Sequence, residues 1–362
     1  MKKGILIACS ISCLVLLGFV IYGCGTTTSS SVTIPRIVFL RGSEWAELDV
    51  YSAKVDGSDV KRLTYNSLGV ATTNWPKLSP DGAKVLYSLQ NGATGLYVID
   101  INGTASQEIS SIAGSVYASW SPDSSKVAFL DGSDLHVWDG VTDDLVTSDA
   151  YSDCSTSFSP DGNLILYRNS ANDLHVYVSS LDAVANVTNN PDSTYSWPVF
   201  SPVDNNIIAY KTCMGIYSLD ISTGTVTTLE TGATHRHICF GPNGEWVYYT
   251  LSNDFPWRIN RVKYNDASSK ETLTSLSSSF PSSSGIELLA DGNKILISTW
   301  HQRLSPMFFP GSSRLFYVID NTADFEGNDS ELYSLDPENP STSKVRLTTN
   351  SVIDCFDPNY WD

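Results

Sequence analysis

The side chains best suited to chemistry in this chain are two histidines and a separate His-Gln pair. His235 and His237 flank Arg236, and His301 precedes Gln302 further along the chain. Strand alternation would place His235 and His237 on one side, and imidazoles with a glutamine oxygen suit a divalent metal such as Mn²⁺ or Zn²⁺. Ordinary surface or channel histidines are the simpler interpretation, and we adopt it. We therefore expect no metal or other cofactor, and keep these four residues as candidate ligands.

Other catalytic patterns are missing from the sequence. It contains no Gly-x-Ser-x-Gly nucleophile elbow and no glycine-rich phosphate loop. The acid-rich stretch 320–329 lacks the ligand spacing and terminal Glu of an EF-hand, so a solvated loop is the better interpretation. The residues thus favour a non-enzymatic role.

The N-terminus has the pattern of a secretory signal. Lys2 and Lys3 precede an apolar stretch over 5–22, and Gly23 stands before Cys24. The segment 21–24 resembles the lipobox of bacterial lipoproteins, and this resemblance implies that Cys24 is lipidated and becomes the new N-terminus. The alternative is an uncleaved transmembrane helix.

The segments after the signal differ in composition. Residues 25–31 are small and hydroxyl-rich, which predicts a flexible tether. We expect a signal peptide over 1–23, a lipidated tether over 24–34 and one domain over 35–362. With 22 Lys+Arg against 39 Asp+Glu, the chain has a net charge of −17. This charge disfavours nucleic acid and electrostatic docking on a bilayer.

A repeat of about 40 residues dominates the chain. An aromatic-Ser-Pro-Asp-Gly pattern recurs, in variants, around Pro80, Pro122, Pro160, Pro202 and Pro242. A β-rich run follows each proline, a second strand and a weaker fourth strand come after it, and Asp-Gly or Asn-Gly provides the tight turn. The period is that of a four-stranded propeller blade.

These units resemble the blades of TolB-type, WD-repeat-like propellers over essentially all of 35–362. The resemblance implies an all-β β-propeller. We expect seven blades, with six or eight as alternatives, because Ala290 and Pro310 head incomplete motifs only twenty residues apart. The chain starts with three strands that lack an innermost one, and 352–359 repeats the innermost-strand motif. N- and C-terminal strands are thus expected to share one blade.

The propeller geometry indicates a candidate ligand face opposite the Asp-Gly turns. Residues seven positions before each motif proline should lie near the channel entrance there: Thr73, Ser115, Asp153, Tyr195, His235 and, in the closing blade, Ser351. Two positions further on, His237 lies on the same face, whereas Trp75, Tyr117 and Trp197 are expected to pack between blades. Cys154, Cys213, Cys239 and Cys355 show no metal-knuckle spacing, so buried free thiols are expected, with disulfides as the alternative that export permits.

The leading functional hypothesis is a membrane-tethered extracytoplasmic binding scaffold. Its partner would be an envelope protein or peptide, or a glycan, and the chain itself a monomer. A metal-dependent polysaccharide lyase is the alternative, because oligogalacturonate lyases bind Mn²⁺ through a His-x-His pair, a distant His and a Gln three residues before the pair. Gly232 stands at that Gln position here, so only Gln302 could replace it. A small-ligand sensor is a third possibility. Gly25 after Cys24 favours the outer membrane or cell surface, with the inner membrane still open.

Overall fold

The computed structural model describes residues 36–41, 49–54, 59–65, 76–89, 95–111, 118–152, 155–188, 196–232, 235–241, 243–251, 258–275, 286–289, 294–297, 315–320, 330–335 and 345–346. Side chains are described for fewer of them, and not for 235–237 or for the strands after residue 272. The chain divides into Met1–Thr33 and Ile34–Asp362. All described residues belong to the second unit.

The described regular structure is all β, in seven sheets that follow one another along the chain. Five sheets have four antiparallel strands each, as the repeat predicts. They are β4–β7 (Lys77–Leu78, Lys84–Leu89, Gly95–Asp100, Gln107–Ser110), β8–β11 (Ala118–Trp120, Val127–Asp131, Asp134–Trp138, Asp143–Thr147), β12–β15 (Ser157–Phe158, Leu164–Arg168, Leu174–Val178, Ala183–Asn186), β16–β19 (Ser196–Phe200, Ile207–Thr212, Gly215–Asp220, Thr225–Thr231) and β20–β23 (His235–Phe240, Trp246–Leu251, Arg258–Lys263, Asp266–Ser275).

The first and last sheets differ from this plan. Among the described residues, the first comprises β1 (Arg36–Arg41), β2 (Asp49–Lys54) and β3 (Lys61–Arg62), as expected, and the source of its innermost strand stays a prediction. The last joins β24 (Ile286–Leu289), β25 (Lys294–Ile297), β26 (Leu315–Asp320), β27 (Ser330–Leu335) and β28 (Val345–Arg346) in one sheet, with β25 and β26 parallel. The strands that follow the two incomplete motifs, β25 and β26, therefore belong to one blade. Seven sheets agree with seven blades, and the expected closing strand at 352–359 lies outside the described residues.

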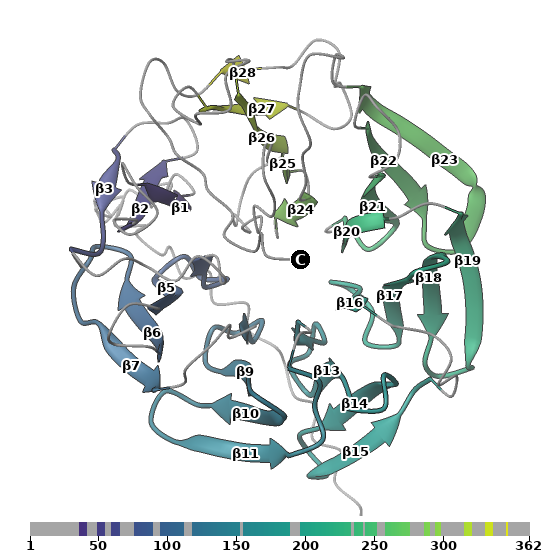
Figure 1. The fold of residues 1–362 in the computed structure, drawn as a ribbon, viewed down its shortest axis with the longest axis horizontal. Coiled ribbons are helices and arrows are strands. Elements are labelled where there is room, and N and C mark those ends of the chain that lie inside the picture. Colours follow the sequence, from purple (N-terminus) through teal and green to yellow (C-terminus); the bar gives the residue numbers. More distant parts are fainter. Residues whose placement is uncertain are drawn as a thin grey trace, which may run out of the picture. The chain divides into compact units, whose positions relative to one another are not determined.

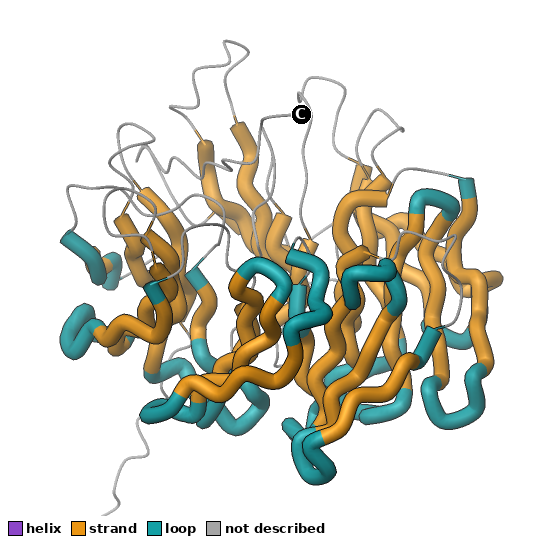
Figure 2. Tube along the Cα trace, turned by 60° about the horizontal axis from the view of Figure 1, so that its bottom comes forward, coloured by secondary structure: helices purple, strands orange, loops and turns teal. Residues whose placement is uncertain are grey.

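Within the second unit the sheets are arranged around a common centre. Figure 1 shows β16, β20 and β24 on the inside and β7, β11, β15, β19 and β23 on the outside. The strands run between two opposite ends where the described turns and loops gather, as Figure 2 shows from the side. The fold is a β-propeller, and each sheet is one blade.

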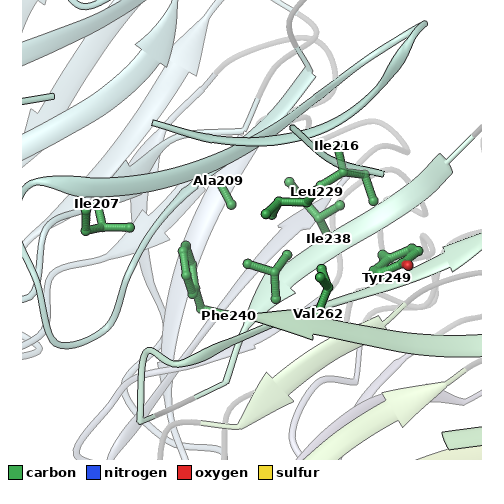
Figure 3. Packing of buried hydrophobic residues seen from close by; sticks show 9 residues of the cluster. Ile207, Ala209, Ile216, Leu229, Ile238, Phe240, Tyr249 and Val262 are labelled. Carbon is green, nitrogen blue, oxygen red and sulfur yellow. The ribbon is translucent and has the colours of Figure 1, made fainter. Parts of the chain in front are cut away.

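The apolar core lies between blades. Each described cluster combines side chains from two consecutive sheets, such as Leu86 and Val98 with Trp120 and Phe129. Figure 3 shows the cluster between the β16–β19 and β20–β23 sheets, where Ile207, Ala209 and Ile216 face Phe240, Tyr249 and Val262. Strand alternation sends successive side chains to opposite faces, so one strand contributes to two such clusters.

The Ser-Pro-Asp-Gly motif is a hydrogen-bonded turn that joins the first two strands of a blade. In the second four-stranded sheet, the Ser121 hydroxyl donates to Asp123 Oδ1 at 2.6 Å and accepts from the Lys126 amide at 2.8 Å. The same bonds recur at Ser159, which donates to Asp161 and accepts from the Leu164 amide. The motif therefore has a structural explanation, because its buried hydroxyl replaces a ladder partner.

Two variants of the motif keep the same turn. Ser124 takes the left-handed conformation that Gly82 and Gly162 adopt elsewhere, with φ of 63°. In the β20–β23 sheet, glycine replaces the motif serine at Gly241, where an added Cβ would lie 3.1 Å from the Tyr248 ring. The exception thus follows from packing against a large neighbour.

We expect Ser121→Ala to destabilise the protein by about 1–3 kcal/mol, because it leaves the Lys126 amide without the acceptor that the buried Ser121 hydroxyl provides. Urea unfolding of the variant measures this. Ser222→Ala is the matched control, since Ser222 also donates to an aspartate, Asp220, but in an exposed turn. Equal changes in both variants would contradict a special role for the motif.

Candidate binding face

Antiparallel topology gives each blade two ends. The Asp-Gly turns lie at one end. At the other lie the turns between second and third strands and the connections from one sheet to the next, which we call the connection face. The candidate residues were assigned to this face. Thr73, Ser115, Asp153, Tyr195, His301, Gln302, Ser351 and Cys24 lie outside the described residues.

The innermost strands β16 and β20 carry the same irregularity where they reach the connection face. In β16 the register shifts between Ser196 and Val199, and in β20 it shifts between His235 and Ile238. Two residues of the inner strand thus oppose one on the partner, which is a β-bulge. The bulge interrupts the regular alternation from which we expected His235 and His237 to share one side.

Trp197 lies within the first of these bulges. Its φ of 53° is rare for a bulky residue and marks a specifically held backbone. The half-buried ring packs against the cluster between the β16–β19 and β20–β23 sheets. The expectation that Trp197 packs between blades is confirmed.

The connection from β11 to β12 forms the best-described part of this face. Ala150 bridges antiparallel to Asn169, and the Ala150 amide donates to the Ser133 carbonyl at 2.8 Å. The Tyr151 amide donates to the Arg168 carbonyl, also at 2.8 Å. The connection is therefore fixed between the turns of two consecutive blades.

Tyr151 and Arg168 make a stacked pair on this support. The Arg168 guanidinium carbon lies 3.7 Å from the centre of the Tyr151 ring, a cation–π geometry. Arg168 is buried, whereas Tyr151 is 38% exposed. Beside them, the Ser170 hydroxyl donates to Asp149, and the Asn169 amide group donates to the other Asp149 oxygen at 3.3 Å. The result is an exposed aromatic ring beside a fixed set of polar groups.

Not every polar group at this end is a site candidate. Asp173 accepts from the Thr188 hydroxyl, and Thr188 also accepts from the Leu174 amide at 2.8 Å. The same arrangement links Asp49 to Thr64 in the first sheet. Because this pairing recurs, it fastens the fourth strand of a blade to the third.

His175 lies in β14 and pairs with Tyr167, the residue before Arg168 in β13. Both ring nitrogens are buried with no hydrogen-bond partner among the described residues, and the ring packs edge-on against Tyr167 with centroids 5.7 Å apart. Burial lowers the pKa of His175, although the nearby carboxylates of Asp149 and Asp173 oppose this. Burial, followed by the Asp149 charge, raises the pKa of Tyr167 to about 12.

The described part of the chain lacks two other kinds of feature. Its His, Cys, Asp and Glu side chains form no group of three that could hold a metal. It also contains no helix long and apolar enough to span a membrane.

Cys213 is a free, exposed thiol at the tip of the β17–β18 turn, so the expectation of burial is wrong there, whereas Cys239 is buried as expected.

The sequence reasoning missed Tyr151, Arg168 and Asp149. Asp149 and Tyr151 stand just before Asp153 in the same connection, so position alone pointed near them. Arg168 also occupies the strand position held by Ser88 and Leu130 in earlier blades. A charge at a repeated core position was the signal available in the sequence.

Comparison with known proteins agrees with this architecture. The family model described as the TolB beta propeller domain matches residues 26–286. The chain belongs to this family. A comparison with curated proteins gives no match.

Solved structures share the family fold. TolB from Acinetobacter baumannii is 21% identical with a TM-score of 0.48, and the alignment covers 64% of this chain and 62% of that chain. An oligogalacturonate lyase in complex with manganese is 14% identical with a TM-score of 0.56, over 86% of this chain and 84% of that chain. Porphyromonas gingivalis dipeptidyl peptidase 4 is 13% identical with a TM-score of 0.51, over 86% and 52% of the two chains. The likenesses to the lyase and the peptidase show the fold alone, and none of the three alignments carries a role over to this chain.

His175 predicts a pH dependence of stability. Since folding lowers its pKa below the usual 6.5, the unfolded chain binds more protons in this range. The free energy of unfolding should therefore fall as pH drops below 6.5, until the pH is below the folded-state pKa. Urea unfolding at successive pH values should show that His175→Phe removes this contribution. His136→Phe, at the equivalent position of the preceding blade, should leave it in place.

Proposed function

We propose that the chain is a non-enzymatic binding scaffold in the cell envelope, which uses the connection face to hold an envelope protein, peptide or glycan. The observation that carries the proposal is the exposed Tyr151 ring stacked on buried Arg168, beside Asp149. Aromatic rings with fixed polar neighbours are frequent at protein–protein and ligand contacts, because little conformational entropy is lost on binding.

The connection that carries Tyr151 is held by backbone hydrogen bonds, which favours a rigid binding surface over a mobile loop. Backbone hydrogen bonds join the connection to Ser133 in one blade and to Arg168 in the next. Such a surface is in its bound shape before the partner arrives. The bulges in β16 and β20 lie at the same end of their blades, so this face combines several departures from the repeat.

The lipid is the second part of the proposal. Acyl chains on Cys24 would hold the domain at an outer membrane or cell surface, and 25–34 would serve as the tether. This anchoring does not need a cationic surface, which suits a chain of net charge −17.

A photo-crosslinking residue at exposed Ala171 should capture an envelope component in cells, because Ala171 lies in the turn beside Tyr151. The matched control is the same probe at Val141, which is 87% exposed at the opposite end of a blade. Adding Tyr151→Ala to the Ala171 probe should reduce capture about tenfold, as expected for loss of a central aromatic contact.

Equal capture from both positions, or none from Ala171, would contradict the proposal. So would stoichiometric Mn²⁺ or Zn²⁺ in the purified untagged protein that is lost in His235→Ala or His301→Ala. That result would favour the metal-dependent lyase, for which the missing Gln at Gly232 is the main objection.

For the anchor, we expect wild-type cells to incorporate labelled fatty acid into the protein and Cys24→Ser to abolish the incorporation. Labelling followed by gel analysis of the immunoprecipitated protein measures this. Cys213→Ser is the control, because Cys213 is an exposed thiol within the propeller and should not affect labelling. Unchanged incorporation in Cys24→Ser would refute the anchor.

A further inference from the structure

In the five four-stranded blades, the outermost strand presents backbone groups that no other described strand uses. These edges are β7, β11, β15, β19 and β23, which lie on the outside in Figure 1. An open edge can pair with a strand from another chain, and proteins commonly prevent this with charges or with bulges that break the register. The five edges differ in these two devices.

Four of the five edges carry both. The pairing of β7, β11, β19 and β23 with the adjacent strand contains a register shift in each case. Each of these strands also carries charged residues: Glu108 in β7, Asp143 and Asp144 in β11, Glu230 in β19, and Lys270 and Glu271 in β23 among them. Their edges are therefore protected.

β15 carries neither device. Its four residues, Ala183–Asn186, pair with β14 in an uninterrupted register and include no charge and no proline. All four are exposed. Val184 is 43% exposed and the adjacent Leu181 is 72% exposed, so the edge is also apolar.

The hydrogen-bond pattern shows which groups are open to a partner. The Val187 amide donates to the Leu174 carbonyl at 2.9 Å, so this pair is hydrogen-bonded across the ladder. In antiparallel pairing such residues alternate, so Ala183 and Ala185 also point their backbone groups inward. The N–H and C=O groups of Val184 and Asn186 then point outward.

The charges beside this edge indicate the kind of strand that would fit. The Tyr177 hydroxyl, on the residue that pairs with Val184, donates to Asp182 Oδ1 at 3.1 Å. Burial, then this bond and the charges of Asp182 and Asp144, raise the pKa of Tyr177, which places both carboxylates near it. A second copy of this chain would bring a net charge of −17 to the same place.

We infer that β15 is a second docking site, which takes a basic extended polypeptide segment as an added strand of the β12–β15 sheet. Outward backbone groups of Val184 and Asn186 supply the hydrogen bonds, and Leu181 and Val184 contact alternate apolar side chains of the segment. Asp144 and Asp182 attract its lysines or arginines. This site is separate from the connection face, so an experiment can refute one of the two proposals and leave the other standing.

The test uses the full chain in detergent and a fluorescein-labelled alternating Lys-Val hexapeptide, with a Glu-Val hexapeptide as the charge control. Fluorescence anisotropy should show binding of the basic peptide only, and hydrogen exchange should slow at the Val184 and Asn186 amides. Val184→Pro removes one outward N–H without touching the β14–β15 ladder, and should weaken binding about fivefold, as expected for one hydrogen bond.

Two further variants at Val184 test the inference even if Val184→Pro disturbs the fold. Val184→Lys should weaken binding of the basic peptide more than Val184→Asp does, because both remove the apolar contact and only the lysine repels the peptide. Val226→Lys is the matched control, because Val226 holds the same position on the bulged edge β19 and is 53% exposed. It should leave binding unchanged.

Several outcomes would overturn the inference. One is that the basic peptide binds wild type and Val184→Lys equally well, or loses as much affinity in Val226→Lys as in Val184→Lys. Another is that hydrogen exchange slows at another blade edge instead of β15, or that the two peptides bind with equal affinity. Dimerisation of the wild type that Val184→Lys abolishes would assign the edge to a second copy and refute the basic segment.

Discussion

Burial between consecutive blades is the interaction on which this protein depends. A single sheet here is too small to bury its own apolar side chains, and each cluster forms only when two neighbouring sheets meet. Val127 and Phe129 pack toward one neighbour, whereas Ala128 and Leu130, which alternate with them, pack toward the next. Each blade is therefore stabilised from both sides, and a change in one strand affects two clusters.

Side-chain hydrogen bonds between the innermost strands of consecutive blades fix how neighbouring blades are oriented. The Trp120 indole donates to the Lys77 carbonyl at 3.0 Å, and the Lys77 ammonium donates to the Ala118 carbonyl at 2.8 Å. Ser119 and Thr156 link the next two sheets through their hydroxyls at 2.8 Å. Polar residues on the innermost strands thus have structural partners in the neighbouring blade. A polar residue near the channel is consequently weak evidence for a ligand site, unless it stands outside this pattern.

The repeat makes departures from it informative. Arg168 stands where the two preceding blades place Ser88 and Leu130 and the next blade places half-buried Lys211, and it supports the exposed Tyr151 ring. Along the outer rim, β15 differs in the opposite sense, because it lacks the charges and bulges of the other edges. One departure adds charge at the connection face and the other removes it from an edge. These two departures are the observations on which the proposed contacts with other molecules rest.

The sequence alone determined the propeller, the approximate blade length and the three described strands of the first blade. The period of the prolines, the Asp-Gly turns and the apolar strand patterns are local signals, and each acts within one blade. Only the tertiary structure decided that the two weak motifs after residue 285 share one five-stranded sheet. It also decided that β16 and β20 are bulged beside Trp197 and His237, and that Tyr151 lies on Arg168. Bulges, edge exposure and cation–π pairs arise from register and from contacts between blades, and no local pattern in one strand encodes them.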